Sequence, residues 1–123
     1  MKPWLKVSAV VLIVFVHLAG LLGSVPRLDI LNETVRALYF HVPMWFTMMF
    51  LFIYSVWSSI QYLRTQNISF DDKAIESVKV GFFFGILGLI TGMLWGNATW
   101  GTFWTSDPKL NNTAIGLLIY AAY

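Results

Sequence analysis

Three long stretches of the chain contain no Asp, Glu, Lys or Arg, and they constrain its fold more than any other feature. They cover residues 7–26, 37–63 and 80–106. Each is longer than the roughly 18 residues that indicate a bilayer-spanning helix. Only 11% of all residues are charged, whereas a soluble domain typically has about 25%. The sequence therefore predicts an all-α integral membrane protein, a polytopic bundle of transmembrane helices.

Within these stretches we place three spans, at residues 7–23, 41–62 and 78–95. The first could instead be the apolar part of a signal peptide, but it is long for one and no clear small-residue cleavage site follows, which favours a retained span. A further uncharged run, residues 110–123, is too short to cross a bilayer and is interpreted as the start of a fourth span. On this interpretation the sequence is the N-terminal part of a longer membrane domain.

Alternating spans determine which connections share a side of the membrane. The N-terminal tail and the connection 63–77 fall on one side, and the loops 24–39 and 95–109 fall on the other. Five Lys and Arg residues lie on the first side when Lys79 at the membrane edge is counted, and three lie on the second. The positive-inside rule then places the N-terminus and 63–77 in the cytoplasm. We expect a multi-pass protein of the plasma (inner) membrane, with 24–39 and 95–109 on its outer, periplasmic face.

Two spacing patterns predict how these elements pack. In the first outer loop, apolar residues recur at helical spacing, which predicts a short amphipathic helix that lies either on the membrane surface or on the bundle. In the third span, glycines recur at steps of 4, 3, 4 and 4, which favours close approach of a neighbouring helix rather than chemistry. The apolar residues are Leu28, Leu31, Val35 and Leu38, and the glycines are Gly81, Gly85, Gly88, Gly92 and Gly96.

Several classes of function are disfavoured by composition. The chain has no cysteine, which excludes disulfides, zinc–thiolate sites and thiol chemistry on these residues. No glycine-rich phosphate loop, Ser-His-Asp set or pair of catalytic carboxylates is visible, so binding is favoured over catalysis. The net charge of +2 is spread among the loops, and we expect no nucleic-acid partner.

The two histidines are interpreted differently. His17 lies inside the first span, where an ionisable group is a functional candidate, but one hydrogen bond would satisfy a neutral ring and a structural role is favoured. His41 precedes Pro43, which helices tolerate in their first turn, so His41 is expected at or just before the outer end of the second span. The positive end of a helix disfavours imidazolium, and neutral imidazole binds metals. The alternative is that His41 is an interfacial anchor.

A tryptophan motif, "WGNATWGTFWTSDPKL", occupies residues 95–110 on the same side as His41. An interfacial aromatic belt would explain its tryptophans separately. It would not explain the glycine that follows two of them, or the acid that ends the run. Flat indoles beside glycines form an open apolar platform for a planar aromatic ligand, and a nearby histidine suggests a metalloporphyrin. The candidate site residues are His41, Trp95, Gly96, Trp100, Gly101, Trp104 and Asp107.

The tryptophan motif resembles the WWD domain of the haem-handling proteins of cytochrome c maturation. A second segment, "LNETVRALYFHVPMW", resembles the part of the same proteins that carries an outer histidine. The best resemblance is to the CcmC-type family, close kin of the CcsA-type synthetase subunits. Both segments occur in the family's order and spacing. The sequence departs from the family at Phe103 and Ser106, where tryptophan is common, so its aromatic platform is thinner.

The resemblance implies a membrane protein of about six helices that binds haem b in transit at its outer face. It implies that His41 is one axial ligand of the haem iron and that a second histidine lies beyond Tyr123. It further implies delivery of haem to a membrane-anchored haem chaperone, with help from ABC-transporter-type membrane subunits, and no enzymatic step. The alternatives are a CcsA-type haem-attachment synthetase subunit and a multi-pass transporter or scaffold subunit without haem.

Overall fold

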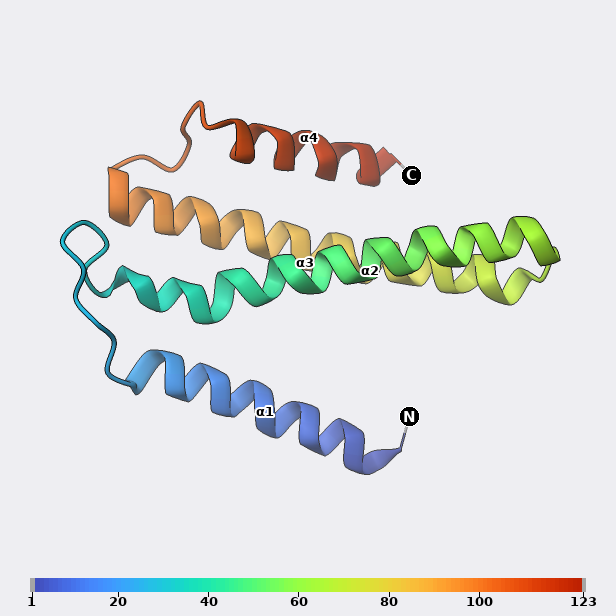
Figure 1. The fold of residues 1–123 in the computed structure, drawn as a ribbon, viewed down its shortest axis with the longest axis horizontal. Coiled ribbons are helices and arrows are strands. Elements are labelled where there is room, and N and C mark those ends of the chain that lie inside the picture. Colours follow the sequence, from blue (N-terminus) through green and yellow to red (C-terminus); the bar gives the residue numbers. More distant parts are fainter. Residues whose placement is uncertain (1, 123) are drawn as a thin grey trace.

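The structure is a computed structural model that describes residues 2–122, and this part of the chain forms a bundle of helices (Figure 1). Three of its helices are long and apolar enough to cross a membrane. This confirms the predicted all-α membrane helix bundle. The helices are α1 (Pro3–Leu22), α2 (Leu38–Thr65), α3 (Ile68–Trp100) and α4 (Pro108–Ala122), with the 3₁₀ helix η1 (Glu33–Ala37) leading into α2.

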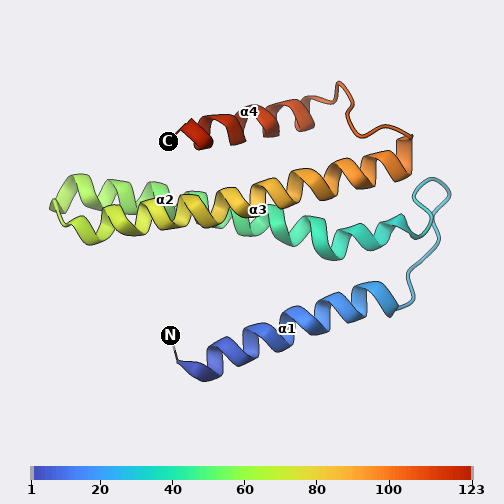
Figure 2. The ribbon, with the colours of Figure 1, turned by 180° about the vertical axis from the view of Figure 1, so that it is seen from behind.

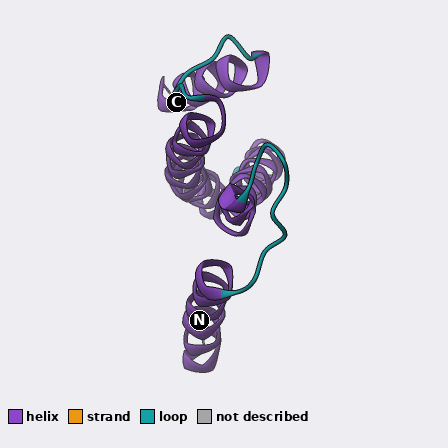
Figure 3. Cartoon of the chain, turned by 90° about the vertical axis from the view of Figure 1, so that its left-hand side faces the viewer, coloured by secondary structure: helices purple, strands orange, loops and turns teal. Residues whose placement is uncertain are grey.

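The four α-helices follow one another in space as they do in the sequence, in a curved row (Figures 1 and 3). Helices α2 and α3 form a long antiparallel hairpin, α4 packs on α3, and α1 packs on α2 (Figure 2). The α1–α2 and α3–α4 connections lie at the same end of the bundle, which we name the connection end, and the α2–α3 turn lies at the opposite end. This arrangement brings η1 close to the end of α3 that carries the tryptophan motif.

The turn between α2 and α3 is much shorter than the connection expected at 63–77. Only Gln66 and Asn67 separate the two helices. Gln66 ends α2 in the left-handed conformation, with φ of 54°, and the Asn67 side chain caps α3 by accepting from the Ser69 N–H at 3.0 Å. The expectation of a loop was wrong because the charges that follow mark the end of an apolar span, not the end of a helix.

The loop expected to hold an amphipathic α-helix, residues 24–39, is mostly irregular. Leu28 and Asn32 are joined by an isolated antiparallel bridge, and Asn32 has a φ of 48°. A residue with this backbone conformation, φ of 48° and ψ of −131°, cannot continue an α-helix, so the helical spacing of the leucines was misleading here. Only η1 and the start of α2 are helical, and η1 packs on both α2 and α3.

Arg36 attaches this loop to α1. Its Nη1 donates to the carbonyl oxygens of Gly20 at 3.0 Å, Leu21 at 3.2 Å and Gly23 at 2.6 Å. These are carbonyls at the C-terminal end of α1, where unpaired acceptors and the helix dipole favour a cation. The contact fixes α1 beside α2 at the connection end.

Glycines of α3 bring the hairpin together. A Cβ added at four of these glycines would approach a side chain of α2, and at Gly85 it would also approach Leu117 of α4. The four α2 residues are spaced by 4, 3 and 4, which matches the spacing of the glycines in reverse order. Gly92 lies against His41, Gly88 against Trp45, Gly85 against Met48, and Gly81 against Phe52. Each of these α2 side chains therefore occupies the space above one glycine, which confirms the predicted close packing for four of the five glycines. The fifth, Gly96, instead faces Thr102 and Trp100.

Candidate functional site

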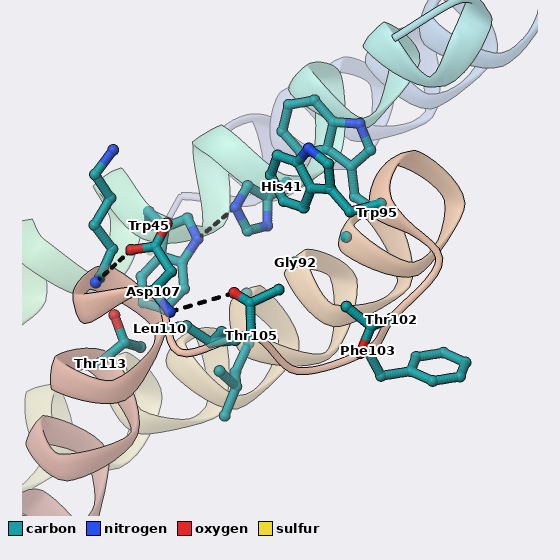
Figure 4. A pocket seen from close by; sticks show the side chains of 15 residues that line it. His41, Trp45, Gly92, Trp95, Thr102, Phe103, Thr105, Asp107, Leu110 and Thr113 are labelled. Carbon is teal, nitrogen blue, oxygen red and sulfur yellow. Dashed lines mark hydrogen bonds between the residues drawn. The ribbon is translucent and has the colours of Figure 1, made fainter. Parts of the chain in front are cut away.

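A cavity of about 360 Å³ opens at the connection end, between α2, α3, the loop after α3 and the first turns of α4 (Figure 4). Its volume is within the range of about 300–1,000 Å³ typical of small-molecule pockets. Four aromatic side chains line it, together with a small set of polar groups that includes one histidine. The aromatic residues are Trp45, Trp95, Trp100 and Phe103.

Five of the seven predicted site residues line this cavity: His41, Trp95, Gly96, Trp100 and Asp107. The structure thus brings residues more than fifty positions apart in the sequence into one site. Two predicted residues lie outside the cavity in the described part of the chain. Gly101 has a φ of 75° and ends α3, with its N–H donating to the Asn97 carbonyl at 2.9 Å. Trp104 instead donates from Nε1 to the Asn111 side chain at 3.2 Å.

His41 lies inside the first turn of α2, because the helix begins at Leu38. We expected His41 at or just before the start of this helix, but α2 begins about one turn earlier, so His41 and Pro43 both lie within it. The cause is η1, which feeds directly into α2 and starts it early. His41 is half-buried and its ring lies between the indoles of Trp45 and Trp95 (Figure 4).

Both ring nitrogens of His41 have partners. The Trp45 Nε1–H donates to His41 Nε2 at 2.9 Å, and an indole nitrogen can only donate. Nε2 is therefore the acceptor, so the proton of the neutral ring is on Nδ1. Nδ1 lies 3.1 Å from Thr91 Oγ1 and donates to it. The Thr91 hydroxyl in turn donates to the Leu87 carbonyl at 2.8 Å.

Two glycines of α3 leave space for the side chains of His41 and Trp45. A Cβ at Gly92 would lie 2.8 Å from His41 Cε1, and a Cβ at Gly88 would lie 3.0 Å from Trp45 Cε2. The first distance is too short for a real contact, so His41 could not keep its place beside any larger residue at position 92. The glycine pattern was interpreted as packing alone, and the structure shows that it also seats side chains of the site.

Trp95 is held more firmly than the other aromatic residues of the motif. Its Nε1 donates to the Thr34 hydroxyl at 3.1 Å, which ties the end of α3 to η1. The ring centroids of Trp95 and His41 are 5.9 Å apart at an interplanar angle of 69°. Trp100 and Phe103 are exposed at 68% and 50%, so they can adapt to a ligand while Trp95 is fixed.

Residues 95–100 belong to α3, so the segment expected to be a loop is irregular only after Trp100. The acid that ends the motif starts the next helix. Asp107 Oδ1 accepts from the Lys109 N–H at 2.7 Å, which is N-cap geometry, and Pro108 is the first residue of α4. Asp107 and Lys109 both reach the cavity wall and give it one charge of each sign.

His17 does not take part in the site. Its Nδ1 lies 2.7 Å from the Ile13 carbonyl oxygen, one turn earlier in α1. A hydrogen bond therefore satisfies this ring, although its partner is in the same helix and not across an interface.

Residues 2–122 contain no group of three or more His, Cys, Asp or Glu side chains that could hold a metal ion. A metal at this site would need a ligand beyond His41, such as the four nitrogens of a porphyrin.

Sequence reasoning missed Trp45 and gave Thr91 no role. Trp45 is one helical turn after His41 and therefore on the same face of α2, a spacing that the sequence displays. Thr91 precedes Gly92, but the register of α2 against α3 was needed to place it beside His41.

The chain is similar in sequence to proteins of haem handling and cytochrome c biogenesis. The family described as Heme exporter protein C matches residues 1–123. A Heme exporter protein C of Bradyrhizobium diazoefficiens is 33% identical over 96% of this chain and 44% of its own length. A putative cytochrome c biosynthesis ccmC-like mitochondrial protein of Marchantia polymorpha is 34% identical over 72% of this chain and 39% of its own length.

A cytochrome c biogenesis protein CcsA of Prochlorococcus marinus is 49% identical over 43% of this chain and 17% of its own length. No solved structure matches the chain significantly. The chain thus spans less than half the length of these curated relatives.

Proposed function

The chain belongs to the Heme exporter protein C family, and from that premise we propose that it binds haem b at the connection end and passes it on during cytochrome c biogenesis. One observation carries the proposal: a histidine whose Nε2 lone pair is held only by a hydrogen bond from Trp45 lies in the wall of an apolar cavity that four aromatic side chains line. A haem site needs an axial ligand for the iron, of which a histidine nitrogen is a common one, and an apolar surface against which the flat macrocycle can lie. Both are supplied by residues that the sequence alone had grouped.

In this proposal His41 is an axial ligand of the haem iron and the aromatic side chains enclose the macrocycle. Trp95 provides a fixed wall, since it is bonded to Thr34, and Trp100 provides a surface that can close over the haem. Asp107 holds the start of α4 in place through its cap on Lys109. The haem is cargo, held without a covalent bond by these residues. We propose that its acceptor is a membrane-anchored haem chaperone and that ABC-transporter-type membrane subunits assist the transfer.

A second candidate is supported by the CcsA relatives, one of which is 49% identical over 43% of this chain. A synthetase subunit would hold haem in the same cavity while thioether bonds form to an apocytochrome. The two functions differ in the fate of the haem. A carrier gives it up unchanged to an acceptor, whereas a synthetase releases it covalently attached.

The proposal is tested with the full-length protein purified from membranes. We expect it to bind one equivalent of haem, all extractable by acidified acetone, and to transfer it to an added haem chaperone. Covalent attachment to an apocytochrome in the absence of other proteins would favour the synthetase. Failure to bind haem would favour the transporter or scaffold, whose tryptophans form only an interfacial belt.

We further propose that the connection end faces the outside of the plasma (inner) membrane. The bundle supports this because η1 and the tryptophan motif share one end, while the α2–α3 turn lies at the other end with the basic residues Arg64 and Lys73 near it (Figure 1). The positive-inside rule places such residues on the cytoplasmic side. Single cysteines at the exposed positions Ser69 and Ser106 test the orientation in intact cells. An impermeant thiol reagent should modify position 106 and not position 69, and the reverse pattern would invert the topology.

A further inference from the structure

We infer that Thr91 and Trp45 together control the ligand nitrogen of His41: Thr91 keeps the proton on Nδ1, and the Trp45 indole N–H occupies the Nε2 lone pair until iron displaces it. The inference rests on the proposed function, because it takes His41 as the haem ligand. It assigns roles to two residues outside the tryptophan motif. Trp45 lines the cavity and Thr91 lies behind the ring.

Thr91 can act only as an acceptor toward His41. Its single hydroxyl proton is directed to the carbonyl oxygens of Leu87 at 2.8 Å and Gly88 at 3.0 Å. The oxygen that remains accepts from His41 Nδ1 at 3.1 Å. This fixes the tautomer in which Nε2 carries the lone pair. Such outer partners of a metal-binding histidine orient the ring and increase its basicity, so Thr91 is a positioning residue.

Trp45 competes with iron for the same lone pair. Its Nε1–H lies 2.9 Å from Nε2, and one lone pair cannot serve an indole proton and an iron atom together. The indole ring lies in the space above Gly88, where an added Cβ would come within 3.0 Å of it. Haem binding therefore costs the Trp45–His41 hydrogen bond, and haem release restores it. Such a competitor suits a protein that must give its ligand up.

The two roles predict opposite effects on haem affinity. Thr91→Val keeps the shape of the side chain but removes the acceptor, and should weaken haem binding by roughly tenfold, the lower part of the range for losing an outer-shell partner. Trp45→Phe keeps an aromatic ring over Gly88 but removes the N–H. It should strengthen haem binding by roughly threefold to tenfold, the value of one ordinary hydrogen bond.

The measurement is a haem titration of the full-length protein, followed by absorption, with the midpoint potential of the bound haem as a second readout. Thr91→Val should raise the potential, because a less basic imidazole stabilises ferric iron less, and Thr91→Ser should restore both values. If Trp45→Phe and Thr91→Val both weaken binding, Trp45 only supports packing and the competition is refuted. If Thr91→Val leaves affinity and potential unchanged, Thr91 does not set the tautomer.

A measurement on the unaltered protein keeps the competition testable if Trp45→Phe folds poorly. With ¹⁵N-labelled indoles, the Trp45 N–H resonance should move upfield when gallium protoporphyrin binds, because its bond to Nε2 is lost. A resonance that stays in place while the porphyrin binds would refute the displacement. Failure of the proposed function is distinct from all these outcomes: haem would then not bind, or its spectrum would not depend on His41.

Discussion

Replacing His41 by alanine in the full-length protein should remove one axial ligand from the bound haem. The aromatic walls contributed by Trp95 and Trp100 remain, so haem should still associate, but as a five-coordinate or mixed-ligand species. We expect the affinity to fall by more than the roughly 10- to 100-fold that follows loss of an outer-shell partner. Absorption and resonance Raman spectra of the purified variant, at equal haem loading, report the coordination number directly.

Two controls make this result specific. His17 is the only other histidine in the chain, and its ring is bonded to the Ile13 carbonyl within α1. His17→Ala should therefore leave the haem spectrum unchanged. Imidazole added to the His41→Ala protein should enter the vacated space beside Gly92 and restore the six-coordinate spectrum. A six-coordinate spectrum in His41→Ala without imidazole would return His41 to the role of an interfacial anchor.

The helices of this bundle were predictable because their cause is local. In a bilayer each backbone group needs an internal partner, so only helices and closed barrels span it, and uncharged runs of this length favour helices. The ends of the helices were less predictable. Residues 68–77 include five charged or hydroxyl-bearing residues before Ser77, yet they form the first turns of α3, because Asn67 caps the helix and Ala74 and Ser77 pack in the interior. Hydropathy therefore predicts which part of a helix lies in the membrane, whereas capping residues determine where the helix begins.

Part of the site could also be predicted from the sequence. His41 lies at the start of the second span and the tryptophan motif at the end of the third, so the alternation of spans places both at the same side of the membrane. Trp45 and Thr91 could not be assigned, because their roles depend on the register of α2 against α3. That register is set by the match between the glycines of α3 and the large side chains of α2, a pairing that becomes evident only when the two helices are seen together.

The aromatic walls should contribute mainly through area and shape, and their removal should have a cumulative effect. Stacking on one aromatic ring is worth about 0.5–1.5 kcal/mol beyond the burial of its area. Trp100→Ala alone should therefore weaken haem retention by about tenfold, since about 1.4 kcal/mol corresponds to that factor. Trp95→Ala with Trp100→Ala should weaken it by about a hundredfold or more, because Trp95 also ties α3 to Thr34.

Trp104 provides the matched control for this series. It belongs to the same motif and is 43% exposed, but it turns toward α4 and bonds Asn111. If the motif acts as a haem platform through the cavity, Trp104→Ala should change haem retention far less than Trp100→Ala. Retention is measured by haem transfer to excess apomyoglobin, with each variant first shown to be present in the membrane. Equal losses for both variants would mean that the tryptophans act as an interfacial belt. Normal retention in the double variant would refute a platform made by Trp95 and Trp100.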